Sequence, residues 1–325
     1  MRARARLNAL GGRSTYDPQY LLKSFETLPV PDRMQVFGRL LWVLVQANMV
    51  DDRPRPPASS VRVVPDGSFW QDAAYAAEKG KMTCPSAVAW RVAELRKAGE
   101  PALWVTTSEG RLLVQRADGR REDPCAGVPW NDGLNALAQS RMWTPTLQMT
   151  SFETTPASKK MTIICKMLDV LHAANLGWIR AGNKVPPVYD SGLVYKEEQL
   201  GKDEWQDIPR TLDLGNGDCE DLASYRVSEL RAKGEAAQHT VEHRRSPRLV
   251  LYHIRVRRQN GDIEDPSCRL GMSGACSNLV PAAKAAQQLD APQTPNMTSG
   301  GSAQQMTGMT PLRSVRPEDV VRAAL

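Results

Sequence analysis

The chain has 325 residues, of which 41% are hydrophobic and 24% are charged, and its formal net charge is +6. This length and composition are typical of a globular protein with two domains, and they exclude a small fold that depends on disulfides or metals. The mild positive charge comes without interleaved basic and aromatic residues, so we predict no specific nucleic-acid binding.

The N-terminal residues 1–20 are predicted to form a basic arm. No apolar segment follows the first arginines, which argues against a secretory signal. The longest apolar stretch, residues 36–50, is interrupted by Arg39, Gln46 and Asn48, so no membrane span is predicted. Six widely spaced cysteines do not form the dense pattern of small secreted domains, and we expect cytoplasmic synthesis in a reducing environment.

A sequence repeat covers most of the chain. The Ser-Phe-Glu-Thr segment at residues 24–27 recurs at residues 151–154, an offset of 127. The Trp-Gln-Asp segments at 70–72 and 205–207 are offset by 135, and the Glu-Asp-Pro segments at 122–124 and 264–266 by 142. Identities in this order predict a tandem duplication, with one copy at residues 21–147 and the second at residues 148–285.

Each copy predicts the same series of elements. A helix near residues 31–49 or 158–176 has apolar residues at helical spacing, and a second helix begins at Cys84 or Cys219. That second helix ends near a glycine, a common residue beyond a helix C-terminus. Strands are predicted at residues 102–106, 112–115, 237–242 and 249–257. Residues 286–325 are expected to form a low-complexity tail with a short C-terminal helix from Pro317, available for a large homo- or hetero-assembly.

The second copy carries a cysteine where a glycine-rich turn meets a predicted helix. Cys219 follows Asp218, a suitable N-cap, and the helix N-terminus favours a thiolate. His253, on the second predicted strand, is the expected base, and Asp265, beyond a tight turn, is expected to orient the imidazole. Two antiparallel strands joined by that turn would bring His253 and Asp265 side by side. Glu220 beside the cysteine opposes thiolate formation, so the histidine must offset it.

These segments resemble the transglutaminase-like superfamily of papain-fold cysteine enzymes. The similarity lies in Gly-Asp-Cys-Glu-Asp at residues 217–221, the strand around His253, and Asp-Pro-Ser at residues 265–267. The resemblance implies an α+β fold made of two tandem units, each with a cysteine-bearing helix packed on an antiparallel sheet. It also implies that Cys219 is the nucleophile, His253 the base and Asp265 the orienting residue.

An acyl-transfer site also needs donors for the oxyanion. The backbone N–H of Cys219 is one candidate, and Trp205 or Gln206 is a second by the same resemblance. Because matching residues stand at 70 and 71 in the first copy, a shared structural role is equally expected. That first copy keeps Cys84 and Asp123 but has Arg111 in the position of the histidine. Arginine stays protonated and cannot act as a base, so we predict a catalytically inactive first copy.

Other cysteines and histidines leave alternatives open. Cys268 and Cys276 could pair, or could join Cys219 and His253 in a zinc site, although no Cys-x-x-Cys spacing supports the latter. His172 is expected in the core, whereas His239 and His243 are expected at the surface. No metal and no cofactor are predicted.

Two functions remain open at this stage. The first is a thiol enzyme that acts on a peptide or amide bond through an acyl-enzyme at Cys219, with hydrolysis favoured over amine transfer. Its partner would be a protein or peptide substrate. The second is a non-enzymatic structural or assembly component of a large particle, such as a phage virion, that reuses the duplicated fold. The inactive first copy and the low-complexity tail favour this alternative.

Overall fold

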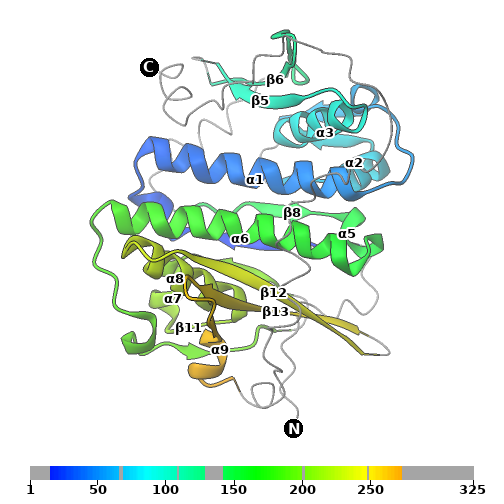
Figure 1. The fold of residues 1–325 in the computed structure, drawn as a ribbon. Coiled ribbons are helices and arrows are strands. Elements are labelled where there is room, and N and C mark those ends of the chain that lie inside the picture. Colours follow the sequence, from blue (N-terminus) through cyan, green and yellow to red (C-terminus); the bar gives the residue numbers. More distant parts are fainter. Residues whose placement is uncertain are drawn as a thin grey trace, which may run out of the picture.

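The computed structural model describes residues 15–65, 69–107, 110–128, 142–199, 202–246 and 249–272. Within these ranges the chain has a mixed α+β fold, with eight α-helices and several small sheets (Figure 1). The expected α+β class is confirmed at this level. Residues 1–14 of the basic arm and the tail at residues 286–325 lie outside the described residues.

The first half of the chain runs from a short strand into the long helix α1 (Val30–Val50) and then to the cysteine-bearing helix α3 (Cys84–Lys97). Its other elements are β1 (Gln19–Leu21), η1 (Lys23–Glu26), η2 (Ala58–Ser60), β2 (Arg62–Val64), β3 (Phe69–Gln71), α2 (Ala73–Lys79), β4 (Lys81–Thr83), β5 (Ala102–Thr106), β6 (Leu112–Arg116) and β7 (Arg121–Glu122).

The second half repeats this order with the long helix α6 (Ala157–Arg180) and the helix α8 (Cys219–Ala232). Its other elements are β8 (Thr146–Gln148), α5 (Thr150–Thr154), η3 (Val188–Asp190), β9 (Val194–Tyr195), β10 (Glu204–Gln206), α7 (Ile208–Leu214), β11 (Asn216–Gly217), β12 (Ala237–Ser246), β13 (Leu249–Arg258), β14 (Ile263–Glu264) and α9 (Pro266–Arg269). Within the described residues the predicted helices and strands are present, and β12 extends four residues beyond its expected end. The helix predicted from Pro317 lies outside the described residues.

Strand registers recur between the halves at the offsets read from the sequence. Val114 pairs with Glu122 across β6 and β7, and Val256 pairs with Glu264 across β13 and β14. Both members of the second pair lie 142 residues after their counterparts. The three-stranded sheets β5–β6–β7 and β12–β13–β14 are antiparallel, and α3 and α8 contact them in corresponding ways.

The two halves exchange strands in one four-stranded sheet of order β10-β1-β8-β3. Strand β1 of the first half lies parallel to β10 of the second, and β8 of the second half lies parallel to β3 of the first. Between them, β1 and β8 run antiparallel with Gln19 opposite Thr146, two positions that are 127 residues apart. Each half therefore supplies strands to this sheet that pair with strands of the other half.

Hydrogen bonds between the halves explain the repeated tetrapeptide. The backbone N–H of Ser24 donates to Oδ2 of Asp207 at 2.6 Å, and that of Ser151 donates to Oδ2 of Asp72 at 2.7 Å. Both aspartates are fully buried N-caps, of α7 and α2. Because a buried N–H without an acceptor is costly, each aspartate has a structural role in joining the two halves.

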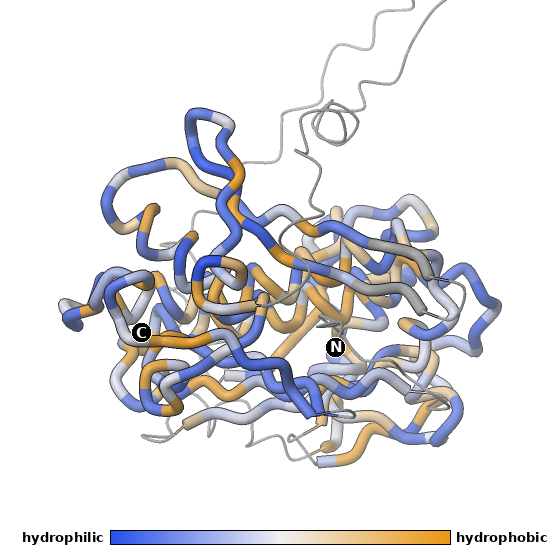
Figure 2. Tube along the Cα trace, turned by 90° about the horizontal axis from the view of Figure 1, so that it is seen from below, coloured by the Kyte–Doolittle hydropathy of each residue, from blue (hydrophilic) through white to orange (hydrophobic). Residues whose placement is uncertain are grey.

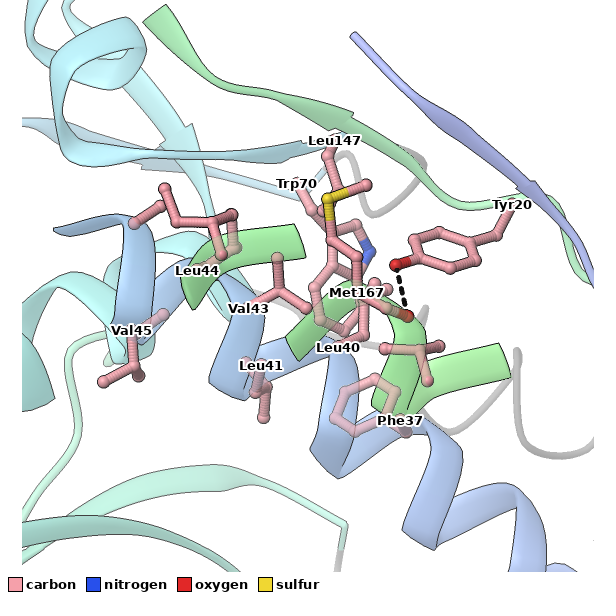
Figure 3. Close-up of a cluster of buried hydrophobic side chains, with 14 of the residues drawn as sticks. Tyr20, Phe37, Leu40, Leu41, Val43, Leu44, Val45, Trp70, Leu147 and Met167 are labelled. Atoms are coloured by element: carbon pink, nitrogen blue, oxygen red, sulfur yellow. Dashed lines mark hydrogen bonds between the residues drawn. The ribbon is translucent and has the colours of Figure 1, made fainter. Parts of the chain in front are cut away.

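Helices α1 and α6 pack side by side through the middle of the molecule (Figure 1). Buried Phe37, Leu40 and Leu44 share one face of α1, the spacing that predicted this helix. In the same cluster, the Tyr20 hydroxyl donates to the backbone carbonyl of Met167 at 3.1 Å (Figure 3). Apolar segments gather inside while the outer loops are mostly hydrophilic (Figure 2). One buried cluster draws on both halves, so the core is continuous across them.

The histidines depart from expectation at two positions, because His172, expected in the core, and His239, expected at the surface, are both partly buried. His172 lies in α6 and its Nδ1 is 2.9 Å from Ser228 Oγ, while His239 Nε2 is 3.2 Å from Ser224 Oγ. The two rings lie 6.2 Å apart. The expectation of a surface His239 is therefore wrong, because β12 turns this side chain toward α8. Among the helices described, none combines the length and apolar character needed to cross a membrane.

Candidate functional site

The N-terminus of α8 is built by a sharp chain reversal. Gly215 ends α7 in the left-handed conformation with φ of 68°, which favours glycine. Gly217 then passes so close to the helix that a Cβ there would lie 3.0 Å from Cβ of Asp221. Asp218 is the N-cap, as predicted, and its backbone N–H donates to Oδ2 of Asp221 at 3.4 Å. These contacts place Cys219 in the first turn of α8.

The thiol of Cys219 is buried, with 4% of the residue exposed. Its S–H donates to Oε2 of Glu220 at a Sγ–Oε2 distance of 3.1 Å. Burial raises the pKa of Cys219 well above its usual value, Glu220 and Asp218 raise it further, and a hydrogen bond from the backbone of Ile254 lowers it. These effects favour the protonated thiol, which lies next to the strand that carries His253.

His253 and Asp265 lie together, as the turn between their strands predicted. His253 Nε2 is 2.7 Å from Oδ2 of Asp265, and both side chains are almost buried, at 13% and 12% exposure. Asp265 is also the N-cap of α9, where its Oδ1 accepts the backbone N–H of Cys268 at 3.1 Å. Because the carboxylate accepts from Nε2–H, the lone pair of the neutral imidazole lies on Nδ1. That Nδ1 is buried and has no hydrogen-bond partner.

The predicted hydrogen bond between Cys219 and His253 is not formed. Cys219 Sγ donates to Glu220 and makes no hydrogen bond to His253, whose Nδ1 remains unpartnered. The backbone N–H of Ile254, the residue after His253, is nevertheless a hydrogen-bond donor to this sulfur. The structure thus joins His253 to Asp265 and places the Cys219 sulfur against the backbone of the strand that carries His253.

The two oxyanion candidates differ in their surroundings. Trp205 is completely buried and its indole N–H donates to Oδ1 of Asp203 at 3.1 Å, which gives it a structural role. Gln206 is 6% exposed, and its backbone N–H donates to Oδ1 of Asp221 at 2.8 Å. Its side-chain Oε1 has no partner. Gln206 is the better placed of the two, since it also lines a surface pocket.

That pocket lies beside the start of α8 and has a volume of about 250 Å³. It is lined by both basic and acidic side chains together with Leu214, and it reaches Gly217 and Asp218, the residues directly before Cys219. The charged lining residues are Lys196, Glu197, Glu198, Lys202, Glu204, Arg210 and Asp218. The charged lining of this pocket suits a polar, charged ligand better than an apolar one.

Sequence reasoning missed the density of buried and partly buried carboxyl groups around Cys219. Besides Glu220 and Asp221, the group includes Glu198 and Asp203, which reach it from the segment between β9 and β10. Burial raises the pKa of Asp203, Asp221 and Glu198, and neighbouring carboxylates raise it further. Only the motif residues could have been found from sequence, because Glu198 and Asp203 lie in a segment between β9 and β10 that is longer than the matching segment between β2 and β3.

The corresponding place in the first half is chemically different. Cys84 is joined to Cys125 in a disulfide, so it offers no free thiol, and Cys125 occupies the sequence position of Ser267. The Arg111 guanidinium forms an ion pair with Asp123, the counterparts of His253 and Asp265. The expectation of reduced cysteines is wrong for this pair, because Cys125 follows Asp123 into the turn that faces the start of α3. Disulfides are typical of oxidising compartments.

The proposed zinc set is not assembled. Cys268 is disulfide-bonded, which removes its thiolate as a ligand, and Cys276 lies outside the described residues. A pairing of Cys268 with Cys276 therefore also falls outside the described part of the chain. The free cysteines in the described ranges are Cys165, which is exposed, and Cys219.

Comparison with known proteins identifies no relative. No family model, no curated protein and no solved structure matches this chain.

Proposed function

We propose that the second half is a transglutaminase-like cysteine hydrolase that cleaves a peptide or amide bond through an acyl-enzyme at Cys219. In this proposal the chain is a tandem duplication of one papain-fold unit, and the first half has lost its activity. The repeated registers of the two halves support the duplication. The single observation that carries the activity is the hydrogen bond between His253 and Asp265, on the strand whose next backbone N–H, that of Ile254, is a hydrogen-bond donor to the free thiol of Cys219.

The chemistry follows from this arrangement. His253 Nδ1 takes the proton of Cys219, and the thiolate attacks the carbonyl carbon of the scissile bond. The tetrahedral intermediate collapses when the imidazolium protonates the leaving amine, which gives a thioester on Cys219. Water, deprotonated by His253, then attacks the thioester and releases the acid. Asp265 holds the imidazole tautomer throughout, and the backbone N–H of Cys219 with the Gln206 amide is proposed to stabilise the oxyanion.

One side-chain movement is required before this cycle begins. The Cys219 Sγ must leave Oε2 of Glu220 and turn toward His253. In this proposal the movement is a rotation about the Cα–Cβ bond of Cys219. The lining of the adjacent pocket favours a polar, charged peptide as the substrate.

The test is selective covalent labelling of the full-length protein with chloroacetamide, followed by mass spectrometry of each cysteine. Cys165 is an exposed free thiol and provides an internal reference within the same chain. We expect Cys219 to be labelled faster than Cys165 in spite of its burial, and the excess to disappear in a His253→Gln variant. Labelling of Cys219 that is slower than that of Cys165, or unchanged by His253→Gln, would count against the enzyme.

The second candidate is a non-enzymatic structural or assembly component, for example of a phage virion. The observation that favours it is the bond from the Cys219 thiol to Glu220 in place of His253. The first half adds support, because it keeps the same registers with a disulfide where a nucleophile would lie. Under this alternative Cys219 labels slowly and His253→Gln changes nothing but stability.

A further inference from the structure

A second pair of a basic and an acidic residue lies beside His253 and Asp265 on the β12–β13–β14 sheet. The guanidinium of Arg255 forms an ion pair with the carboxylate of Glu242. His253 and Arg255 are two residues apart on β13, so their side chains leave the strand on the same face, opposite to that of the fully buried Ile254. One face of the sheet therefore carries two neighbouring pairs.

Both pairs run diagonally across the strands. On β12, Glu242 lies directly opposite His253, yet it pairs with Arg255. On the other side, the register of β13 with β14 brings Asp265 level with Arg255, yet Asp265 binds His253. Direct and diagonal neighbours are both within reach of long side chains in a sheet. Each carboxylate is therefore within reach of each base, and the observed choice of partners needs a cause.

Arg255 is buried, with 5% of the residue exposed. A guanidinium is almost never buried unless it is paired, because its removal from water is costly. Its Nε is buried and, among the described residues, has no hydrogen-bond partner. Burial lowers the pKa of Arg255, and the nearby Asp265 carboxylate raises it. Arg255 therefore has an unused donor near the carboxylate that orients His253.

The first half shows what an arginine does on this face when the opposite strand offers no carboxylate. There Arg111 occupies the position of His253 and forms an ion pair with Asp123, the counterpart of Asp265. The residue opposite Arg111 is Thr107, whose backbone N–H donates to the Arg111 carbonyl at 2.9 Å. An arginine on this face thus takes the aspartate when no other acid holds it.

The first half also shows that the fold does not require the Arg255–Glu242 pair. The registers of β6 with β7 and of β13 with β14 match at an offset of 142, which makes Leu113 the counterpart of Arg255. Leu113 and Thr107 thus stand where the second half has a buried ion pair, and both sheets form. Because apolar residues often stabilise a fold as well as a buried ion pair does, the pair points to a role beside His253.

We propose that Glu242 is a positioning residue for the base: it holds the Arg255 guanidinium toward β12, so that Asp265 stays with His253. This inference rests on the proposed function only in naming His253 as the base. The ionisable groups next to this ring are Glu242 on β12, Arg255 on β13 and Asp265 before α9, with Cys219 of α8 against the backbone of the same strand.

The two members of the pair should act on the imidazole in opposite directions. In Glu242→Gln, the guanidinium keeps its charge, disfavours the imidazolium and competes with His253 for Asp265. In Arg255→Met, the Glu242 carboxylate is left unpaired opposite the ring and favours the imidazolium. Arg255→Leu combined with Glu242→Thr introduces the residues of the first half and removes both charges, so the ring should behave nearly as in the wild type.

The test is NMR of the full-length protein with 15N-labelled histidine, which reports the tautomer of each ring and the pH at which it takes up a proton. A His253→Gln variant identifies the His253 signals among the four histidines. We expect the midpoint pH to fall by about 1 in Glu242→Gln and to rise by about 1 in Arg255→Met. In the double variant and in Arg255→Lys, which keeps the charge, the midpoint should stay close to that of the wild type.

The tautomer gives a second readout. The Nε2–H form should lose population in Glu242→Gln, because Arg255 then competes for the carboxylate that fixes it. Glu235→Gln is the matched control, since it removes a carboxylate from Arg258 on the same strand and leaves the buried pair intact. It should leave the His253 signals unchanged. A role confined to stability would lower the melting temperature of both single variants without moving the midpoint in opposite directions.

Two results would overturn the proposal: a His253 midpoint that moves the same way in Glu242→Gln and Arg255→Met, or one that moves in neither folded variant. Should either variant fail to fold, Glu242→Asp decides, because its shorter side chain keeps the charge but releases Arg255. An Nε2–H population that stays constant in Glu242→Asp would then reject the proposal.

The NMR midpoints do not depend on the reactivity of Cys219. Unselective labelling of Cys219 together with the expected NMR shifts would reject the hydrolase and keep the role of Glu242. Selective labelling with unchanged NMR signals in Glu242→Gln would do the reverse. The two proposals can therefore fail separately.

Discussion

His253 Nε2 lies 2.7 Å from Oδ2 of Asp265, across a turn that joins residues twelve apart in the chain. In the first half, Arg111 and Asp123 form an ion pair at the matching positions. An acidic residue thus fixes a cationic or basic partner in both halves, but only the imidazole can accept a proton. Mutation of the aspartate in each half can therefore distinguish an effect on proton transfer from an effect on the fold.

Replacement of Asp265 by asparagine should abolish the selective reactivity of Cys219. The amide keeps the shape of the carboxylate but no longer enforces Nε2–H, so Nδ1 loses its role as acceptor. We expect the chloroacetamide labelling rate of Cys219 to fall at least about tenfold, whereas that of Cys165 stays constant. Asp123→Asn, the same change in the first half, is the control and should leave both rates unaltered. A rate that responds equally to both variants would contradict the assignment.

The Cys84–Cys125 disulfide should stabilise the fold without affecting the second half. The two residues are 41 apart, and a loop of that length is expected to contribute about 4 kcal/mol by restricting the unfolded chain. A Cys125→Ser variant should therefore lower the free energy of unfolding by about 2–4 kcal/mol in urea titrations. Cys165→Ser, at an exposed free cysteine, should change it by no more than about 0.5 kcal/mol. Equal stability of the two variants would show that the disulfide does not form in solution.

The two buried hydrogen bonds between the halves, from Ser24 to Asp207 and from Ser151 to Asp72, should contribute similarly to stability. Asp207→Ala removes the acceptor of the Ser24 N–H and the N-cap of α7, and Asp72→Ala does the same for Ser151 and α2. Each should cost about 2–4 kcal/mol, because buried donors are left without partners. Asp213→Ala, which breaks an exposed ion pair with Lys23, should cost less than about 1 kcal/mol. Urea titration measures all three, and a cost for Asp207→Ala as small as that for Asp213→Ala would contradict the structure.

The buried histidines should make the fold less stable in mild acid. Burial and the nearby Arg231 together lower the pKa of His172 to about 4, and burial, His172 and Arg231 together lower the pKa of His239 to about 3. The unfolded chain, with a histidine pKa near 6.5, therefore binds more protons below that pH. The stabilisation is complete above pH 6.5 and is lost as the pH falls toward 4.

This effect can be isolated from the carboxyl groups, whose raised pKa values act in the opposite direction. Between pH 7.5 and 5 the wild type should lose about 2 kcal/mol more stability than a His172→Gln, His239→Gln double variant, after allowance for partial exposure of these rings. Urea titrations of both proteins at the two pH values provide the measurement. The same loss in both proteins would mean that these histidines are already protonated or exposed in the folded state.

The sequence predicted local structure well and side-chain chemistry less well. The helix starts at Cys84 and Cys219 and the pairing of His253 with Asp265 follow from short-range patterns, namely capping residues and a tight turn. The Cys84–Cys125 disulfide, the bond from Cys219 to Glu220 and the position of Glu198 depend on distances between segments far apart in the chain. Periodicity carries no information about such distances, so these features emerged only from the fold.

The strand exchange has a consequence for how the protein can be taken apart. Strand β1 belongs by sequence to residues 21–147 or the arm before it, yet its parallel neighbour is β10, the strand that leads to the start of α7 and then to Cys219. A fragment that begins near residue 148 would expose the edge of β10 and leave Asp207 without Ser24. The first half therefore resembles a permanently tethered subunit, because the half that carries the thiol does not close its own sheet.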